Sequence, residues 1–169
     1  VSAHEHVLRG GWDRLEFPGL MLRGKVLGLV GCGRIGQRVA AYGAAFGMTP
    51  IGVDPYQKSW PSHIESISLD KLAESADVIS VHVHLNSETK HLLSAEILEK
   101  TKPGVLLINT SRGAVVDESA LLDGLQSGRI GGAAIDVMVA EPAVAEDALV
   151  HYAKDHSNLL ITPHVGGYC

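Results

Sequence analysis

The sequence predicts an α/β fold, namely an open, doubly wound parallel sheet with helices on both faces. Short β-branched runs alternate along the chain with longer segments that carry apolar residues at helical spacing. The short runs are continuously hydrophobic, which is typical of strands buried on both faces. This alternation is the pattern of right-handed βαβ units. The 169 residues, 46% of them hydrophobic and 20% charged, supply enough apolar surface for one core.

Six strands and five helices are expected in alternation. The strands are expected at residues 26–30, 50–53, 78–83, 105–109, 133–137 and 159–162. The helices are expected at residues 35–46, 69–75, 95–101, 118–127 and 148–156. Two helix ends carry local signals. Gly47 stands where a C-terminal cap favours a positive φ angle, and Asp117 precedes Glu118 as an N-cap.

The first 23 residues are expected to form an arm outside the sheet, and residues 24–169 the domain itself. Apolar groups at Trp12, Leu15, Phe17 and residues 20–22 suggest that the arm contacts a second copy, because large apolar side chains outside a core often mark an interface. The alternative is that they fold back on their own domain. The chain starts at Val1 and stops in an expected loop, so we expect it to be a fragment.

Composition excludes several classes of partner. Asp and Glu outnumber Lys and Arg by 19 to 14, and no basic block occurs, so we expect no nucleic-acid or membrane partner. No apolar run approaches the roughly 18 residues that a membrane helix needs. We find no signal-peptide pattern, so a cytoplasmic location is expected. The two cysteines, Cys32 and Cys169, cannot form a dense disulfide framework, which agrees with a reducing compartment.

A glycine motif, Gly31-Cys32-Gly33-Arg34-Ile35-Gly36, follows the first strand and opens a helix. Gly31 permits the tight turn, Gly33 lets the backbone approach a pyrophosphate, and Gly36 allows close packing of the helix. Asp54 ends the second strand, where a carboxylate accepts hydrogen bonds from the adenosine ribose. The Asp54 carboxylate should repel the extra phosphate of NADP, which favours NAD. The glycine motif together with Asp54 predicts that the sheet is of the Rossmann type. The alternative is a plain turn, with Asp54 capping a loop.

Two other residue types near this motif have more than one interpretation. The field of a helix N-terminus can lower the pKa of the Cys32 thiol and make it reactive, but Cys32 can also be a small side chain in a crowded loop. His82 and His84 are predicted to share one face of a strand, as two metal ligands would. No third ligand is evident. We therefore favour packing against the cofactor, or simple exposure, for these two residues.

The last three strands each end in a residue suited to a small acid. Arg112 follows the fourth strand, where its planar guanidinium can bind a carboxylate, although alone it is equally suited to a surface loop or a structural salt bridge. Glu141 follows the fifth strand and His164 the sixth. Glu141 can hold one ring nitrogen of His164 while the other exchanges a proton with substrate. Asp136 can bind a nicotinamide amide. Ligands bind outside the carboxyl ends of parallel strands, so these residues predict a dehydrogenase.

The motifs together resemble the D-isomer-specific 2-hydroxyacid dehydrogenase family over residues 22–167. The resemblance rests on residues 22–25 leading into the glycine motif, on residues 109–117, on Asp136 with Glu141-Pro142, and on residues 162–167. It implies that His164 is the catalytic acid and base, that Glu141 orients it, and that Arg112 grips the substrate carboxylate and polarises its carbonyl.

The resemblance also implies a cofactor site and further parts of the protein. Arg34 and Ile35 would touch the NAD pyrophosphate, Asp54 the ribose and Asp136 the nicotinamide. We also expect Thr110, His82 and His164 to contact the cofactor. The resemblance implies a homodimer formed through this domain, a 2-hydroxy or 2-keto acid as substrate, and a second, substrate-binding domain that this chain lacks. We therefore expect NAD binding with little activity from the fragment alone.

Two other functions are compatible with the same residues. Transcriptional corepressors similar to this family keep the fold and the catalytic trio while working as NAD-sensing binding modules. A dehydrogenase of another small oxyanion, such as phosphite, would use a similar set of side chains. Formate is disfavoured, because formate dehydrogenases of similar sequence carry glutamine where Glu141 stands. The segment 143–156 is expected to be a surface helix without an assigned function.

Overall fold

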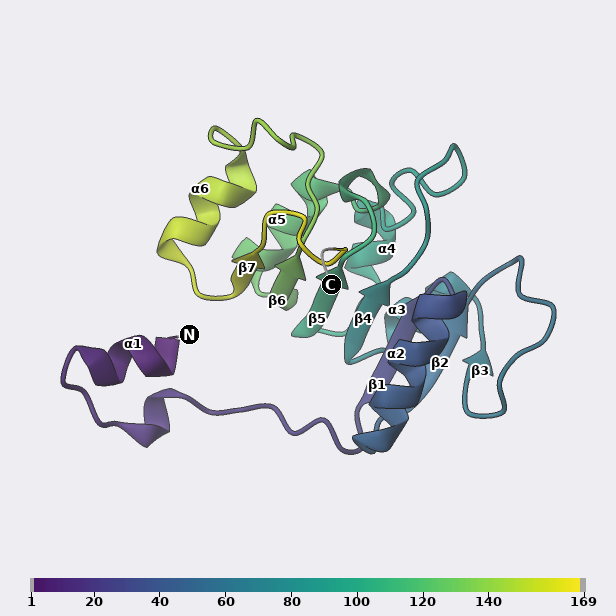
Figure 1. The fold of residues 1–169 in the computed structure, drawn as a ribbon, viewed down its shortest axis with the longest axis horizontal. Helices are drawn as coiled ribbons and strands as arrows, with labels where there is room; N and C mark the ends of the chain where they lie inside the picture. The colour runs from purple at the N-terminus through teal and green to yellow at the C-terminus, as the bar shows by residue number, and fades with distance from the viewer. Residues whose placement is uncertain (1, 168–169) are drawn as a thin grey trace.

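The computed structural model describes residues 2–167 and contains a seven-stranded, all-parallel sheet in the order β3-β2-β1-β4-β5-β6-β7 (Figure 1). Val1 and Cys169, which figure in the expectations above, lie outside the described residues. The strands are β1 (Val26–Val30), β2 (Thr49–Val53), β3 (Glu65–Ser66), β4 (Val78–Val81), β5 (Val105–Asn109), β6 (Ile130–Ile135) and β7 (Leu159–Ile161). The predicted α/β class and parallel sheet are confirmed.

The helices that cover the sheet follow the strands in the expected alternation, and one further helix precedes them in the arm. They are α1 (Ser2–Leu8), α2 (Arg34–Ala45), α3 (Leu69–Ser75), α4 (Ala95–Glu99), α5 (Glu118–Ser127) and α6 (Ala148–Asp155), with two 3₁₀ turns, η1 (Arg14–Glu16) and η2 (Gly113–Val115). The two predicted caps are present. Gly47 has φ +79°, and the Asp117 side chain accepts the amides of Ser119 and Ala120.

Three strand predictions need correction. The sheet has a seventh strand, β3, whose two exposed residues form an edge and give no apolar signal. Strand β4 ends at Val81, so His82 and His84 do not share a strand face. Strand β6 begins at Ile130 rather than three residues later, because Gly131 and Gly132 lie within it although glycine has a low strand propensity.

The hydrophobic core forms two clusters, one on each face of the sheet, and one cluster is larger than the other. On one face, α3 to α6 contribute buried leucines to a large cluster, at Leu72, Leu98, Leu121, Leu125 and Leu149. On the other face, α2 contributes Ala40 to a smaller cluster near β1 and β2. The β5 to β7 half of that second face is less covered: Leu106 and Ile108 are half-buried and Leu160 is exposed.

The arm extends away from the body of the domain (Figure 1). Its apolar side chains do not fold back on the sheet: Trp12 is 89% and Leu15 82% exposed. Local contacts centre on His6, whose ring packs edge-on against Phe17 and accepts the amide of Asp13. The arm is therefore a small unit that presents apolar groups to the outside.

The order of the strands fixes where a ligand can bind. From β1 the chain moves outward to β2 and β3, then returns to β4 on the opposite side of β1. The connections after β1 and β4 therefore leave in opposite directions, which opens a crevice at the carboxyl ends of these strands. Within residues 2–167, no helix is long and apolar enough to cross a membrane.

Candidate active site

The glycine motif forms a tight turn between β1 and α2. Gly31 has φ +93°, and a Cβ atom on Gly36 would lie 2.1 Å from the carbonyl oxygen of Gly31, so only glycine permits this approach of helix to turn. The side chain of Gln37 donates to the carbonyl of Cys32 at 2.8 Å. A Cβ atom on Gly33 would meet nothing within 4 Å. The outer side of the turn is therefore open to a phosphate group.

The neighbouring residues of the turn lie on that open side. Arg34 and Ile35, the predicted pyrophosphate contacts, are both exposed at the first turn of α2. The amides of a helix N-terminus favour an anion. The predicted contacts are therefore accessible to a dinucleotide.

Asp54 follows β2 and ties this strand to the glycine turn. One carboxylate oxygen accepts the amide of Cys32 at 2.9 Å, and the other accepts the amide of Tyr56 at 2.9 Å. Asp54 thus caps its own loop, as the plain-turn alternative expected. A carboxylate has about four acceptor positions, so the predicted bonds to ribose hydroxyls remain available.

Cys32 is a buried structural side chain, so the reactive-thiol hypothesis is wrong. Burial, together with the negative charge of Asp54, raises the pKa of the Cys32 thiol to about 12. A thiol with that pKa is not a thiolate at neutral pH. The prediction of a small side chain in a crowded loop is confirmed, since a Cβ on Gly52 of β2 would lie 2.4 Å from the Cys32 sulfur.

His82 follows β4 and lies against the glycine turn. Its Nε2 is 2.9 Å from the Ser80 hydroxyl, and its backbone carbonyl oxygen is 2.7 Å from where a Cβ on Gly31 would lie. Burial lowers the pKa of His82 to about 4, so the imidazole is neutral at physiological pH. His84 is exposed, and no group of three potential metal ligands occurs within residues 2–167. The metal-ligand alternative finds no support in this part of the chain, and the contact of His82 with the cofactor stays a prediction.

The loop that carries Arg112 is shaped by Asn109, the buried last residue of β5. The Asn109 amide donates to the carbonyl of Arg112 at 3.0 Å, and its oxygen accepts the amide and hydroxyl of Ser111. Arg112 is exposed and forms no ion pair with any residue between 2 and 167, so the salt-bridge alternative finds no support there. Thr110 is exposed at the same edge.

Asp136, just after β6, anchors the loop that contains His164. One carboxylate oxygen accepts the Thr162 hydroxyl and the Val165 amide, and the other accepts the Gly166 amide at 2.8 Å. Burial acts to raise the pKa of Asp136, but these hydrogen bonds and the nearby His164 outweigh it, so the pKa lies below its ordinary value. The nicotinamide contact stays a prediction, and the anchoring was not foreseen.

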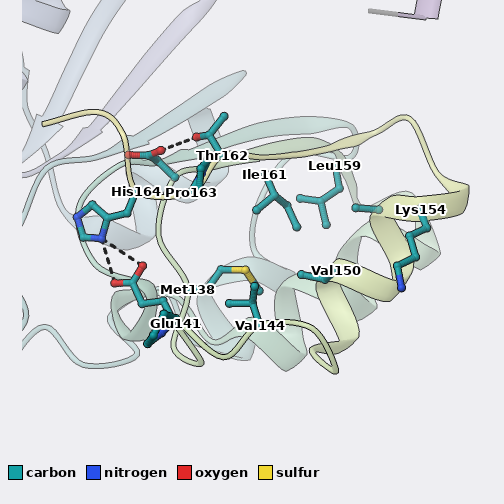
Figure 2. Close-up of a pocket in the computed structure, with 13 residues that line it drawn as sticks. Met138, Glu141, Val144, Val150, Lys154, Leu159, Ile161, Thr162, Pro163 and His164 are labelled. Carbon is teal, nitrogen blue, oxygen red and sulfur yellow. Dashed lines mark hydrogen bonds and ion pairs between the residues drawn. The ribbon is translucent and has the colours of Figure 1, made fainter. Parts of the chain in front are cut away.

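His164 and Glu141 meet at the end of this edge. The Nδ1 atom of His164 lies 3.1 Å from each carboxylate oxygen of Glu141, and the other ring nitrogen faces away from it (Figure 2). His164 has φ +55°, a backbone conformation that non-glycine residues rarely adopt and that occurs often at functional sites. The pair therefore has the geometry of an oriented imidazole with one nitrogen available for proton exchange.

A largely apolar cavity of about 740 Å³ lies beside this pair, between α6, β7 and the loop after β6 (Figure 2). Met138, Val144, Val150 and Leu159 form much of its wall. The α6 helix confirms the predicted helix in the 148–156 segment and forms one side of the cavity.

The sheet order places the predicted site residues in a functional sequence along one edge. Because all strands are parallel, their carboxyl ends lie on the same side of the sheet. From the β2 side of the sheet to its β7 edge, the residues are Asp54 after β2, the glycine motif after β1, His82 after β4, Arg112 after β5, Asp136 and Glu141 after β6, and His164 after β7. The groups suited to a ribose and pyrophosphate occupy one end, and the groups suited to proton transfer and carboxylate binding occupy the other.

The sequence is similar to known proteins over almost all of its length. The sequence matches the family model described as D-isomer specific 2-hydroxyacid dehydrogenase, NAD binding domain, over residues 1–166. It is 44% identical over 158 residues to D-3-phosphoglycerate dehydrogenase of Bacillus subtilis (strain 168), which covers 92% of this chain and 29% of that protein. The resemblance predicted from the motifs is confirmed.

Two further relatives show the same relation. Hydroxypyruvate reductase of Thermotoga maritima is 40% identical over 157 residues, covering 93% of this chain and 51% of that protein. The structure of D-lactate dehydrogenase from Aquifex aeolicus, complexed with NAD and lactic acid, has a TM-score of 0.86 and 33% identity, covering 99% of this chain and 55% of that one. The chain thus spans about a third to about half of the length of these relatives.

We expect Asp136→Asn to lower the free energy of unfolding at neutral pH by about 1–2 kcal/mol, because one donor of the His164 loop then loses its acceptor. The folded-state pKa of Asp136 is lowered. Its stabilisation is therefore fully present above the unfolded value of about 3.9 and is lost as the pH falls through the folded pKa. The difference between wild type and variant should shrink below about pH 4 in urea unfolding.

The matched control is Asp155→Asn, at an exposed acid that ends α6. It should change stability little at any pH. A stability difference for Asp136→Asn that stays constant between neutral and acidic pH would contradict the anchoring role.

Proposed function

Because the chain belongs to the D-isomer-specific 2-hydroxyacid dehydrogenase family, as its NAD-binding domain, we propose that the full protein transfers a hydride between a D-2-hydroxy acid and NAD. The observation that carries the proposal is the His164–Glu141 pair, held at 3.1 Å on the same sheet edge as the glycine turn. An oriented imidazole next to a dinucleotide site is what the oxidation of an alcohol to a carbonyl requires.

The cofactor would lie across the carboxyl ends of β2, β1, β4 and β5. Gly33 leaves room for the pyrophosphate, and Arg34 supplies a positive charge beside it. Asp54 would accept the ribose hydroxyls and disfavour the extra phosphate of NADP by charge repulsion. When bound, NAD supplies the hydride acceptor, and the residues of this chain bind and orient it.

The proton chemistry belongs to the other end of the edge. Glu141 holds Nδ1 of His164, so the remaining ring nitrogen would take the hydroxyl proton of the substrate as its hydride departs. In the reverse direction the same nitrogen would return that proton to the carbonyl oxygen. Arg112 would bind the substrate carboxylate through its guanidinium and polarise the neighbouring carbonyl.

We further propose a division of labour within the full protein. Residues 1–23 form an arm and residues 24–169 the NAD-binding domain, while a separate domain completes the substrate site and excludes water. Positioning and exclusion of water contribute several kcal/mol to catalysis, so the isolated domain should bind NAD but turn over slowly. The free, buried thiol of Cys32 and the formal net charge of −5 support a cytoplasmic protein with a small-molecule partner and no nucleic-acid or membrane partner.

Cofactor binding can be tested by titrating the domain with NAD and NADP in a calorimeter. We expect wild type to bind NAD more tightly than NADP. Gly33→Ala should weaken NAD binding at least about tenfold without loss of stability, because the added Cβ occupies only the space of the pyrophosphate. Asp54→Ala should weaken NAD binding and narrow the difference between the two cofactors.

Gly36→Ala is the contrasting variant. Its added Cβ would meet the Gly31 carbonyl at 2.1 Å, so it should lose both stability and NAD binding. Equal NAD affinity in wild type and Gly33→Ala would place the dinucleotide elsewhere and contradict the proposed cofactor site.

Catalysis can be tested in the full-length protein with a panel of D-2-hydroxy and 2-keto acids. We expect His164→Gln to lower kcat by about 100-fold or more, since general acid–base catalysis contributes about 10²–10⁴-fold. Glu141→Gln should lower kcat less, and Arg112→Lys should mainly raise KM because a bidentate contact is lost.

The same binding and activity measurements also distinguish the dehydrogenase from the two alternative functions, a corepressor-like module and a dehydrogenase of another small oxyanion. Tight NAD binding with negligible turnover on every hydroxy acid, and NAD-dependent association with a partner protein, would favour a corepressor-like module. Turnover of phosphite with no turnover of hydroxy acids would retain the enzyme and change its substrate.

We also propose that this domain forms a homodimer to which the arm contributes. The supporting observation is the exposure of Trp12, Leu15 and Met21 on an arm that lies apart from its own domain (Figure 1). Exposed aromatic and aliphatic groups on one segment are costly in water unless another surface covers them. A second copy of this chain is the partner that we infer.

In sedimentation experiments, Trp12→Ala should shift the protein toward the monomer, because it removes the largest exposed apolar side chain of the arm. Leu160→Ala, at an exposed position of β7, is the control and should leave the dimer intact. If the sedimentation behaviour of Trp12→Ala matched that of wild type, the arm would have no role in the dimer.

A further inference from the structure

Glu118 connects helix α5 to the loop that carries Glu141. It is the first residue of α5, it is half-buried, and its Oε1 atom accepts the backbone amide of Val139 at 2.8 Å. Val139 lies two residues before Glu141 in the chain. The bond therefore holds the loop at a point next to the predicted catalytic pair, although Glu118 itself does not contact His164.

The same part of the loop is also contacted by the backbone of the Arg112 segment. A Cβ atom on Gly113 would lie 2.3 Å from the carbonyl carbon of Met138 and 2.5 Å from the amide nitrogen of Val139. The arginine loop thus packs directly on the loop after β6, and a short 3₁₀ turn leads from there to Glu118. One continuous segment, 112–118, therefore carries Arg112 at one end and contacts the Glu141 loop twice, through the Gly113 backbone and through the Glu118 side chain.

The pKa of Glu118 reflects its half-buried position beside the Glu141 loop. Burial raises the pKa of Glu118, the amide of Val139 opposes this rise, the carboxylates of Asp147 and Glu141 add to it, and His91 opposes it. The carboxylate of Glu141 is therefore one of the charges near Glu118, which agrees with the hydrogen bond that joins α5 to the Glu141 loop.

We propose that Glu118 is a positioning residue that fixes Glu141, and through it His164, relative to Arg112 by holding the Val139 amide against the Gly113 backbone. The inference rests on the proposed dehydrogenase function for its catalytic consequence. Its structural consequence, the fixed geometry of the Glu141–His164 pair, does not depend on turnover.

Three variants of the full-length protein separate positioning from general stability. Glu118→Ala removes the acceptor of the Val139 amide. Glu118→Gln keeps a side-chain oxygen that can accept the same amide. Asp123→Ala, at an exposed acid in the same helix, is the matched control.

We expect Glu118→Ala to lower kcat on the order of 100-fold, since a displacement of about 1 Å at a catalytic group can cost that much, while the Kd for NAD stays unchanged. Hydrogen exchange of the Val139 amide should become faster, and the ¹⁵N resonances of the His164 ring should show that Nδ1 has lost its fixed partner. Glu118→Gln should restore the exchange protection and most of kcat. Asp123→Ala should resemble wild type in every measurement.

Two results would overturn the proposal. One is an unchanged His164 ring spectrum in Glu118→Ala despite faster exchange at Val139. The other is a loss of kcat that Glu118→Gln does not restore. If wild type shows no dehydrogenase activity but the His164 spectrum responds to Glu118→Ala, the positioning role stands and the proposed activity fails, so the two failures are distinguishable.

Discussion

The whole site depends on the parallel direction of the strands. Each strand that enters the sheet in the same direction delivers its following loop to the same edge, whatever its position in the chain. The order β3-β2-β1-β4-β5-β6-β7 then sorts these loops in space. Asp54 and the glycine turn lie next to each other although helix α2 separates them in the sequence. Arg112, Glu141 and His164 follow three neighbouring strands of the sheet. An antiparallel hairpin anywhere in β4 to β7 would send one of the three to the opposite edge.

Polar anchors then determine where each loop projects beyond the edge. A buried carboxylate or amide has to be satisfied by hydrogen bonds, because leaving it unpaired costs several kcal/mol. The Asn109 side chain forms its hydrogen bonds with the loop that carries Arg112, and the Asp136 carboxylate forms its hydrogen bonds with the loop that carries His164. The hydrogen bonds that pair the buried side chain are thus the same bonds that fix the shape of the exposed loop. This coupling explains why the last residue of β5 and the first residue after β6 are polar although both are buried.

The sequence predicted this site unevenly, for physical reasons. Strands 26–30 and 105–109 and helices 69–75 and 118–127 have the predicted bounds, because their apolar periodicity and caps are local signals. The start of β6 was missed because glycine carries no such signal. The anchoring by Asp136 and Asn109 and the contact of Glu118 with Val139 were also missed. These contacts depend on partners 2 to 30 residues away, and their only trace in the sequence is a polar residue at a strand end, for Asn109 and Asp136, or at a helix start, for Glu118. At Cys32 the field of the helix N-terminus and the crowding of the loop predicted different roles, and burial decides for the structural one.

The two ends of the sheet edge are therefore stabilised in different ways. Around β1 and β2, apolar clusters pack on both faces of the sheet, and Gly36 approaches Gly31 closely, so the glycine turn is fixed by packing. Around β5 to β7, one face is partly uncovered, and the loops rely on hydrogen bonds to a few buried or half-buried side chains. A hydrogen bond weakens steeply when its angle departs from linearity, whereas the energy of apolar contact is spread over many atoms. The loops that carry Arg112, Glu141 and His164 should thus respond to single polar substitutions more than the glycine turn does.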